Sequence, residues 1–356
     1  MIRNLPIITD RKIRIGVVGC GRISKNHLEA IQTFCDDFDL VAVCDIDARA
    51  LDALELDHKV TKFDDLNEML VTENLDVITI CTPSGLHADQ TIMAAEYGVN
   101  IICEKPMATR YMDGLRMVKA CDQASVRLFV VKQNRLNPTL QLLKSAVSEE
   151  RFGSIKLVQI NVFWTRPQDY YDHGMGWRGT WEFDGGAFMN QASHYVDLAD
   201  WLIGPVEKVQ AFSNTTRIIE AEDTGVLNLK WRNGALGSMA VTMLTYPQNL
   251  EGSITILGET GTVKVGGVAV NEIQTWDFAN QRDYDDQVKK TNYETTSVYG
   301  YGHPRYYENV ISVLRGNMEP ETDGREGLKS LELLTATYLA ARDNKTIGLP
   351  LNLLGY

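Results

Sequence analysis

The feature that most constrains the fold is a glycine-rich turn near the start of the chain. The apolar run IRIGVVG at residues 13–19 is followed by Cys-Gly-Arg-Ile-Ser, so Gly19 and Gly21 stand between a predicted strand and a predicted helix. In a dinucleotide-binding unit the first glycine permits the tight turn, and the second lets the backbone approach a pyrophosphate at the helix N-terminus. The third position is Ser24, which is still small. The turn therefore predicts a dinucleotide site.

The next predicted strand supports this interpretation. It ends at Asp45, 24 residues after Gly21. A carboxylate at that place accepts hydrogen bonds from ribose hydroxyls and repels a 2′-phosphate. The sequence therefore favours NAD over NADP. The alternative is an ordinary glycine turn.

The first third of the chain alternates between short apolar runs and helical patterns. Strands that are apolar throughout and separated by helices indicate a parallel sheet covered on both faces. We predict strands at residues 13–19, 40–45, 76–82, 100–106 and 127–133.

The rest of the chain has few helices between its strands. We predict strands at residues 155–164, 206–214, 224–233, 235–244 and 252–267, a helix at 185–203 and a final helix pair at about 303–316 and 324–342. RNGA and GETG are hairpin turn signals. The predicted fold class is therefore α/β. A doubly wound Rossmann domain at residues 1–134 precedes an α+β domain at 135–356 with an open, mostly antiparallel sheet.

Composition excludes several classes of function. The chain has 356 residues and a net charge of −12, which argues against nucleic acid as a partner because phosphate binding needs a basic surface. No apolar run reaches the roughly 18 residues that a membrane span needs. The six cysteines form no CxxC, so neither a metal site nor disulfides are expected. We expect a cytoplasmic protein without a membrane or nucleic-acid partner.

The predicted helix at 185–203 has two stripes. Its core stripe contains Phe188, Ala192, Tyr195, Ala199 and Leu202, at helical spacing. The second stripe contains Asn190, His194, Asp197 and Trp201, and it has neither Lys nor Glu. From this segment alone, His194 is either a structural histidine on a half-buried helix or a group that faces a ligand.

Two polar loops follow predicted strands. CTPSGLH spans residues 81–87 and EKPM spans 104–107. Ligands bind at the carboxyl ends of such strands. Lys105, beside an oxidised nicotinamide, could hydrogen-bond a substrate hydroxyl and stabilise the developing alkoxide. The alternative is a surface lysine in a loop.

Taken together and in this order, GVVGCGRIS, CTPSGLH, EKP and the segment from Gly185 to Asp197 resemble the Gfo/Idh/MocA oxidoreductase family. The resemblance covers essentially the whole chain. It implies that Lys105 and His194 are the catalytic residues. Many members carry Asp four residues before that histidine, whereas this chain has Asn190, which cannot take a proton. Lys105 and His194 must then suffice.

The resemblance also implies a set of binding residues. The expected cofactor-binding residues are Gly19, Gly21, Arg22, Ile23, Asp45, Thr82, Pro83, Ser84, His87, Glu104, Lys105, Gln133, Trp177 and Arg178. The expected substrate-binding residues are Lys105, Arg166, Tyr170, Asn190, Gln191 and His194.

Four longer segments are similar to the UDP-N-acetylglucosaminuronate 3-dehydrogenases: residues 131–143, 166–171, 177–197 and 249–264. This similarity implies NAD-dependent oxidation of the C3 hydroxyl of UDP-2-acetamido-2-deoxy-D-glucuronate, in the synthesis of diacetamido-uronic acids for surface polysaccharide (O-antigen). It further implies a homotetramer and raises the possibility that 2-oxoglutarate recycles the cofactor.

Such a substrate carries a diphosphate and a carboxylate, so an acidic protein needs a local cationic cluster. Arg135, Arg166 and Arg178 lie in or near the segments concerned. Arginine binds such groups at two points. We expect Arg166 to bind an anionic group of the substrate. The alternative is that it is a solvated charge at the rim of the site.

Aromatic residues could stack on the uracil. They are Tyr170, Tyr171 and those of YGYGHPRYY at residues 299–307. The alternative is that they belong to the core or an interface.

Other functions stay open. One is a dehydrogenase of a free sugar or inositol, which needs no anion pocket. Another is a non-catalytic dinucleotide sensor, which needs neither Lys105 nor His194. A third, an assembly partner for the next enzyme, is neither supported nor excluded.

Overall fold

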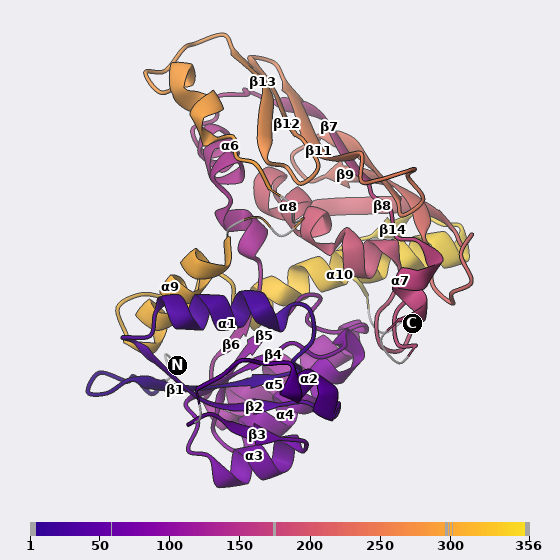
Figure 1. Cartoon of the computed structure of the whole chain (residues 1–356). Helices are drawn as coiled ribbons and strands as arrows, with labels where there is room; N and C mark the ends of the chain where they lie inside the picture. The colour runs from indigo at the N-terminus through magenta and orange to yellow at the C-terminus, as the bar shows by residue number, and fades with distance from the viewer. Residues whose placement is uncertain are drawn as a thin grey trace. The chain divides into compact units, whose positions relative to one another are not determined.

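The computed structural model describes residues 5–57, 59–173, 176–295, 298, 300 and 302–352. The chain forms two compact units, one of Met1–Lys132 with His303–Leu331 and one of Gln133–Gly302 with Glu332–Tyr356. The return of residues 303–331 to the first unit was not anticipated from the sequence. The predicted boundary, between a Rossmann domain that ends at residue 134 and an α+β domain that begins at residue 135, stays a prediction. Figure 1 labels the elements of both units.

The first unit contains a six-stranded parallel sheet in the order β3-β2-β1-β4-β5-β6. The order reverses direction between β1 and β4, which is where ligands bind in doubly wound sheets. This is the predicted Rossmann architecture, with β3 as an additional strand. Its strands are β1 (Ile13–Val18), β2 (Phe38–Cys44), β3 (Thr61–Phe63), β4 (Val77–Ile80), β5 (Asn100–Cys103) and β6 (Leu128–Val130).

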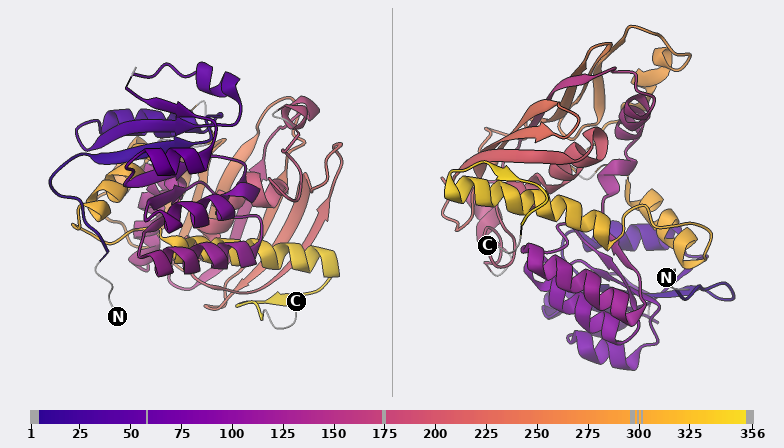
Figure 2. Two further views of the ribbon diagram at one scale, coloured as in Figure 1. Left: turned by 90° about the horizontal axis from the view of Figure 1, so that it is seen from below. Right: turned by 180° about the vertical axis from the view of Figure 1, so that it is seen from behind.

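Helices connect these strands because each connection carries an apolar stripe that packs on the sheet. In α1, His27, Ala30 and Ile31 are buried while the opposite side is exposed. Figure 2 shows the same elements from below and from behind. The helices are α1 (Ser24–Thr33), α2 (Ala48–Asp52), α3 (Leu66–Thr72), α4 (His87–Glu96) and α5 (Tyr111–Ala124), with α9 (Gly302–Leu314) in the returning segment.

The second unit contains an eight-stranded sheet in the order β13-β12-β11-β7-β10-β9-β8-β14. Its pairings are antiparallel except that of β7 with β10, which is parallel. The predicted open, mostly antiparallel sheet is confirmed. The strands are β7 (Ile155–Phe163), β8 (Val206–Asn214), β9 (Thr224–Trp231), β10 (Leu236–Thr242), β11 (Glu251–Gly258), β12 (Gly261–Gly266), β13 (Glu272–Phe278) and β14 (Ile347–Gly348).

One face of this sheet is covered and the other is open. Leu227, Leu229 and Trp231 of β9 are buried, whereas Val226, which precedes them, is 45% exposed. The helices of this unit are α6 (Pro138–Ser148), α7 (Gln168–Asp172), α8 (Ser193–Ile203) and most of α10 (Gly324–Asp343). Tyr195 of α8 is buried and meets Trp164, which follows β7, edge to face. The core therefore lies on the α8 side.

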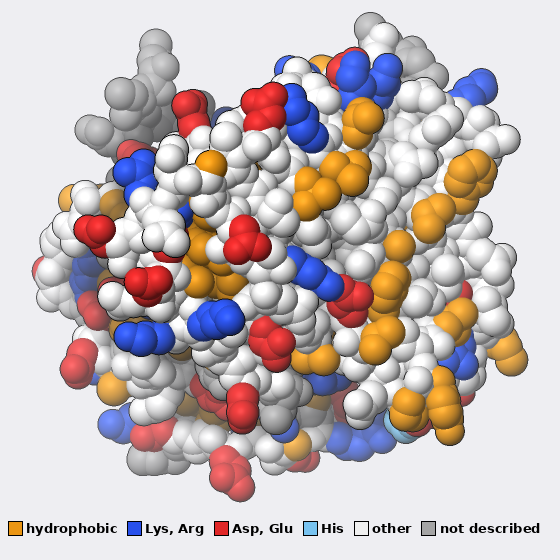
Figure 3. Space-filling model, turned by 90° about the horizontal axis from the view of Figure 1, so that it is seen from above, with side chains coloured by type: hydrophobic (Ala, Val, Ile, Leu, Met, Phe, Trp, Pro, Cys, Tyr) orange, Lys and Arg blue, Asp and Glu red, His pale blue; other side chains and the backbone are white. Residues whose placement is uncertain are grey.

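Hydrophobic side chains also remain on the open face. Leu157, Phe212, Val226 and Leu236 are each about half exposed. Strand register places Phe212 opposite Val226 and Leu236 opposite Leu157. Figure 3 shows hydrophobic side chains gathered in rows on one side of the molecule. Among the described residues, no helix is long and apolar enough to cross a membrane.

Candidate active site

The glycine-rich turn has the shape of a phosphate cradle. Gly19 has φ +87°, and a Cβ there would come within 2.7 Å of the Cys81 carbonyl carbon. At Gly21, by contrast, a Cβ would meet no atom within 4 Å. The turn is closed by Ser24, whose Oγ donates to the Gly21 carbonyl oxygen over 2.7 Å at the first turn of α1. The open side of Gly21 fits a pyrophosphate at the N-terminus of this helix.

Asp45 lies at the carboxyl end of β2, as predicted, and it also braces the turn. Its Oδ2 accepts from the Cys20 N–H over 2.6 Å, and its Oδ1 accepts from the Asp47 N–H over 2.8 Å. Cys20 stands between the two glycines, so the carboxylate fixes the backbone of the cradle. Arg22 is exposed and Ile23 is half-buried beside it.

The loops after β4 and β5 are joined by His87. Its Nδ1 lies 3.0 Å from the Pro106 carbonyl oxygen and its Nε2 lies 2.9 Å from that of Thr82. The imidazole is buried, so it connects the two loops at the carboxyl edge of the sheet. Thr82 Oγ1 donates to Gln90 Oε1 over 2.5 Å. Beside them, Pro83 is half-buried and Ser84 is buried.

Glu104 follows β5 directly, and its carboxylate is turned into the protein. His27 Nε2 lies 2.9 Å from Glu104 Oε1, and the Lys105 backbone N–H donates to Oε2 over 3.0 Å. Lys105 itself is half-buried. The EKP segment is therefore anchored through its glutamate, and the lysine stands next to that anchor.

In the second unit, the predicted helix at 185–203 is divided. A π-turn at Ala187–Gln191 precedes α8, which begins at Ser193. The expectation of one continuous helix from residue 185 was wrong. Gly185 has φ +77°, so the chain turns before the π-turn begins, and Ala192 separates the π-turn from α8. A Cβ at Gly186 would overlap the buried Glu222 carboxylate. Glu222 Oε1 accepts from the Phe188 N–H over 2.8 Å, which holds the π-turn in place.

His194 occupies the first turn of α8 and is buried. Its Nε2 lies 3.3 Å from Nε2 of Gln133. Asn190, on the preceding π-turn, donates from Nδ2 to Asp184 Oδ1. Asp184 Oδ2 accepts from the Gly179 N–H over 2.7 Å. Asn190 is thus tied to a buried carboxylate six residues earlier, a partner that the sequence did not indicate.

Two arginines lie near the ring of Tyr170. The guanidinium carbon of Arg166 lies 5.5 Å from the ring centroid, and that of Arg178 lies 4.8 Å from it. Arg166 Nε donates to Gln191 Oε1 over 3.1 Å, and Gln191 Nε2 donates to the Tyr170 hydroxyl over 3.2 Å. Arg178 also lies 5.0 Å from the ring of Trp177. Within the described part of the chain, neither guanidinium has an ion-pair partner.

The third cationic candidate differs from these two. Arg135 is buried and forms a two-point ion pair with Asp197. The guanidinium of Arg135 therefore already binds a carboxylate of the protein itself.

The predicted aromatic residues are described only in part. Tyr171 is buried and packs edge to face on Tyr170, so it belongs to the core of its loop. Tyr306 and Tyr307 are buried in the first unit. Tyr299 and Tyr301 lie outside the described residues.

Three residues around Glu104 and Gly186 carried no signal in the sequence: His27, His303 and Glu222. Tyr307 was predicted only as a candidate to stack on the uracil. His27 and Glu104 are separated by 77 positions, and His27 and Tyr307 by 280. A contact between such distant positions leaves no local pattern. The one local clue is His27, a histidine in the helix that is predicted after the glycine-rich turn.

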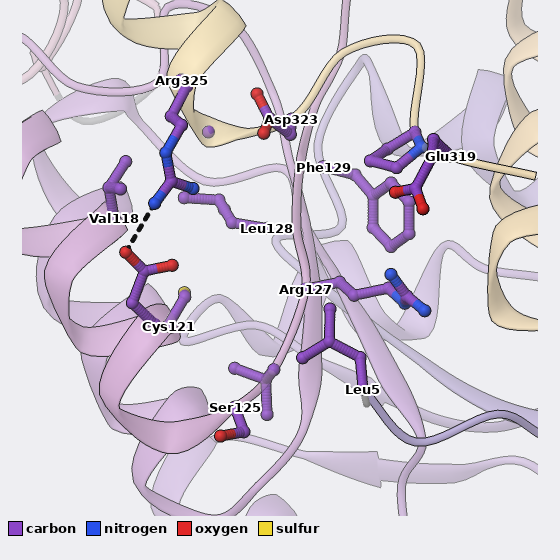
Figure 4. Close-up of a pocket in the computed structure, with 14 residues that line it drawn as sticks. Leu5, Val118, Cys121, Ser125, Arg127, Leu128, Phe129, Glu319, Asp323 and Arg325 are labelled. Carbon is purple, nitrogen blue, oxygen red and sulfur yellow. Dashed lines mark hydrogen bonds and ion pairs between the residues drawn. The ribbon is translucent and has the colours of Figure 1, made fainter. Parts of the chain in front are cut away.

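A pocket of about 620 Å³ in the first unit lies elsewhere (Figure 4). It is formed by the end of α5, the start of β6, the loop at residues 319–323 and the first residues of α10. Arg127 and Glu319 line it, and Arg325 pairs there with Asp122 over 2.7 Å. The amino end of β6 is opposite the carboxyl ends at which doubly wound sheets bind ligands. None of the predicted site residues lines this pocket.

Comparison with family models gives two matches. Residues 13–132 match the NAD-binding Rossmann fold of an oxidoreductase family, and residues 144–349 match the C-terminal alpha/beta domain of the same family. Together they span most of the chain.

Solved structures give a narrower comparison. The WlbA dehydrogenase from Bordetella pertussis, solved with NADH and UDP-GlcNAcA, is 63% identical, with a TM-score of 0.94 over 97% of this chain and 100% of that one. The WlbA dehydrogenase from Chromobacterium violaceum, solved with the same two ligands, is 60% identical, with a TM-score of 0.94 over 99% of this chain and 100% of that one. The D-apiose dehydrogenase of Paraburkholderia graminis is 28% identical over 96% of this chain and 91% of its own length.

Proposed function

The chain belongs to the oxidoreductase family that joins an NAD-binding Rossmann fold to a C-terminal alpha/beta domain, and on this premise we propose that it oxidises the C3 hydroxyl of UDP-2-acetamido-2-deoxy-D-glucuronate with NAD⁺. The observation that carries this proposal is the 63% identity, over 97% of the chain, with a dehydrogenase solved with NADH and UDP-GlcNAcA. The arginine arrangement around Tyr170 supports it independently.

The first unit offers the groups that NAD needs. The open side of Gly21 and the N-terminus of α1 would hold the pyrophosphate. Asp45 would accept from the adenosine ribose, because it ends β2 beside the cradle. Thr82, Pro83, Ser84 and Glu104 would lie along the nicotinamide half, at the carboxyl ends of β4 and β5. When bound, NAD⁺ supplies the hydride acceptor.

Lys105 and His194 would manage the proton of the C3 hydroxyl. The backbone of Lys105 is fixed by its hydrogen bond to Glu104. From there the ammonium group would hydrogen-bond the C3 hydroxyl and stabilise the developing alkoxide. His194 has a nitrogen that can accept a proton, whereas the amide of Asn190 cannot. Asn190 and Gln191 would instead orient the sugar, since both stand on the π-turn before His194.

The two arginines would bind anionic groups, Arg166 on the substrate and Arg178 on the cofactor. A guanidinium recognises a carboxylate or a phosphate through two parallel N–H donors. Arg166 and Arg178 both lie near the ring of Tyr170 and are held by backbone contacts, and no described carboxylate competes for them. On a chain with a net charge of −12, such a local cationic pair is a specific feature. We assign Arg166 to the substrate and keep Arg178, with Trp177, as a contact to the cofactor.

The open face of the second sheet supports a homo-oligomer. Half-exposed Leu157, Phe212, Val226 and Leu236 form paired rows on it, and exposed apolar surfaces of this kind mark association sites. We therefore keep the homotetramer as part of the proposal. The cytoplasmic location, a place in lipopolysaccharide synthesis and recycling of the cofactor by 2-oxoglutarate are further parts of it.

The proposal is tested by NADH formation with a set of substrates. We expect reduction with UDP-2-acetamido-2-deoxy-glucuronate and much slower reduction with UDP-N-acetylglucosamine, which lacks the carboxylate. D-apiose and myo-inositol serve as free-polyol comparisons. Faster reduction with either of them would favour the free-sugar alternative. Tight NAD⁺ binding without formation of NADH from any of the four compounds would favour the sensor.

A further inference from the structure

A hydrogen-bonded network is buried in the first unit behind the EKP segment. The Tyr307 hydroxyl lies 2.9 Å from Thr79 Oγ1 and 2.8 Å from His27 Nδ1. His27 Nε2 then lies 2.9 Å from Glu104 Oε1. His303 Nε2 lies 3.9 Å from the same carboxylate oxygen, and all five side chains are buried. These residues come from α1, β4, α9 and the segment after β5, so the network spans the unit.

The charge state of this network follows from its partners. Burial alone raises the pKa of the Glu104 carboxyl, but the hydrogen bond from His27 and the nearby His303 imidazole outweigh it and hold the pKa well below its usual value. Burial lowers the pKa of His27, which is therefore neutral. Glu104 is an anion between two imidazoles.

The ionised carboxylate then determines the position of each proton along the hydrogen bonds, one after another. An ionised carboxylate only accepts, so His27 carries its proton on Nε2 and donates to Glu104. Its Nδ1 must accept, so the Tyr307 hydroxyl donates to it and itself accepts from the Thr79 hydroxyl. The second carboxylate oxygen accepts from the Lys105 N–H. In this series of hydrogen bonds, every donor therefore points toward Glu104.

A metal ion is the other interpretation of two histidines and a glutamate. The ligand atoms of His27, Glu104 and His303 lie within 4.8 Å of one another. Both ring nitrogens of His27 already have protein partners, however, and Nε2 is bonded directly to the carboxylate. The geometry favours a proton network over a bound cation.

We propose that the network maintains Glu104 as a buried anion whose charge favours the oxidised over the reduced nicotinamide cofactor, with His27 and Tyr307 as positioning residues. This inference rests on the proposed function, because it requires the nicotinamide to bind beside Glu104. The oxidised ring carries a positive charge and the reduced ring does not. A fixed negative charge in a site of low dielectric therefore stabilises NAD⁺ selectively.

The test compares the dissociation constants of NAD⁺ and NADH for the full-length protein, without substrate. In Glu104→Gln, which keeps the shape of the side chain, we expect the ratio of Kd for NAD⁺ to Kd for NADH to rise by about tenfold or more. Tyr307→Phe removes the donor to His27 Nδ1 and should shift the ratio in the same direction by a smaller factor. Tyr306→Phe is the matched control, because it removes a buried hydroxyl from the same helix that does not contact His27.

The outcomes separate the two claims. A purely structural role for Glu104 would weaken both cofactors equally and leave the ratio unchanged, which overturns the inference alone. If Glu104→Gln fails to fold, an unchanged ratio in Tyr307→Phe overturns it. A stoichiometric transition metal in the purified protein, removed by chelation with a change in the ratio, also overturns it. If the wild-type protein binds neither cofactor, the proposed function fails and this inference fails with it.

Discussion

Arg135 and Asp197 form a buried ion pair at two points, with Nε to Oδ2 and a terminal guanidinium nitrogen to Oδ1 both at 2.7 Å. The same two segments carry Gln133 and His194, whose side chains meet at 3.3 Å. Asp197 stands one helical turn after His194 on α8, and Arg135 stands two residues after Gln133. The ion pair therefore fixes the register in which the proposed catalytic histidine meets its neighbour.

Breaking this ion pair should destabilise the protein. Asp197→Asn leaves a buried guanidinium without its counter-charge, which costs about 3–5 kcal/mol when one partner of a buried pair is removed. Denaturant unfolding measures the loss. Asp200→Asn, one turn further along α8 and half-buried, is the control and should cost less than about 1 kcal/mol. Equal losses of stability in Asp197→Asn and Asp200→Asn would show that the Arg135–Asp197 ion pair does not stabilise the fold.

The proposed catalytic residues are tested by turnover. Lys105→Met and His194→Asn should each lower kcat by about 10²- to 10⁴-fold if these groups do acid–base work. Circular dichroism and thermal unfolding serve as controls for the fold. Near-normal rates in both variants, with the fold intact, would remove the assignment and leave His194 as a structural histidine.

The role of Arg166 should appear in substrate binding. Arg166→Leu is expected to raise KM for the UDP-sugar by about 10- to 100-fold, because charge-assisted two-point contacts are worth about 1.5–3 kcal/mol. The dissociation constant for NAD⁺ should hardly change. Arg166→Lys keeps the charge but loses the two-point geometry, and it should fall between Leu and wild type. An unchanged KM in Arg166→Leu would identify this arginine as a rim charge.

Glu222 gives a prediction for stability as a function of pH. Burial raises its pKa from 4.5 to about 7 in the folded protein. Between these values the folded state holds a proton that the unfolded state has released, so this group's contribution to stability falls as pH rises from about 4.5 to 7. Relative to Glu222→Gln, the wild type should lose on the order of 3 kcal/mol from pH 4 to pH 8. Parallel pH profiles for the two proteins would contradict this.

The open sheet face predicts an effect on assembly. Phe212→Glu places a charge among half-exposed apolar side chains and should shift the oligomer toward smaller species in light scattering. Lys119→Glu, exposed on α5 of the first unit, is the comparison and should leave the mass unchanged. Equal masses for wild type and Phe212→Glu would separate this face from assembly.

The sequence predicted those parts of the structure that depend on neighbouring residues. Gly19 and Gly21 follow a strand directly, and their roles depend on backbone conformation that glycine alone adopts easily. The strand β3 was missed because three residues show no periodicity, and β14 has only two. The division of the helix at residues 185–203 was missed because the apolar spacing of Phe188 and Ala192 continues through the π-turn.

Parts of the site that depend on distant contacts could not be predicted. Arg135 was a candidate for the substrate because it lies in one of the segments that resemble the UDP-sugar dehydrogenases. Its ion pair could not be predicted, because Asp197 is 62 residues away in the sequence. Glu104 was predicted to bind the cofactor from its place after a strand, but nothing local showed His27 or Tyr307 behind it. The sequence indicated which residues carry chemistry, whereas the structure shows which of them are already paired.

The central claim is oxidation at C3 of the UDP-sugar, and one isotope measurement tests it most directly. The protein is incubated with NAD⁺ and UDP-2-acetamido-2-deoxy-glucuronate that carries deuterium at C3, and both products are weighed by mass spectrometry. Our account predicts that the reduced cofactor carries the deuterium and that the sugar nucleotide loses it together with the hydroxyl proton. A sugar that retains its deuterium, whether unchanged or oxidised at another carbon, would contradict the account.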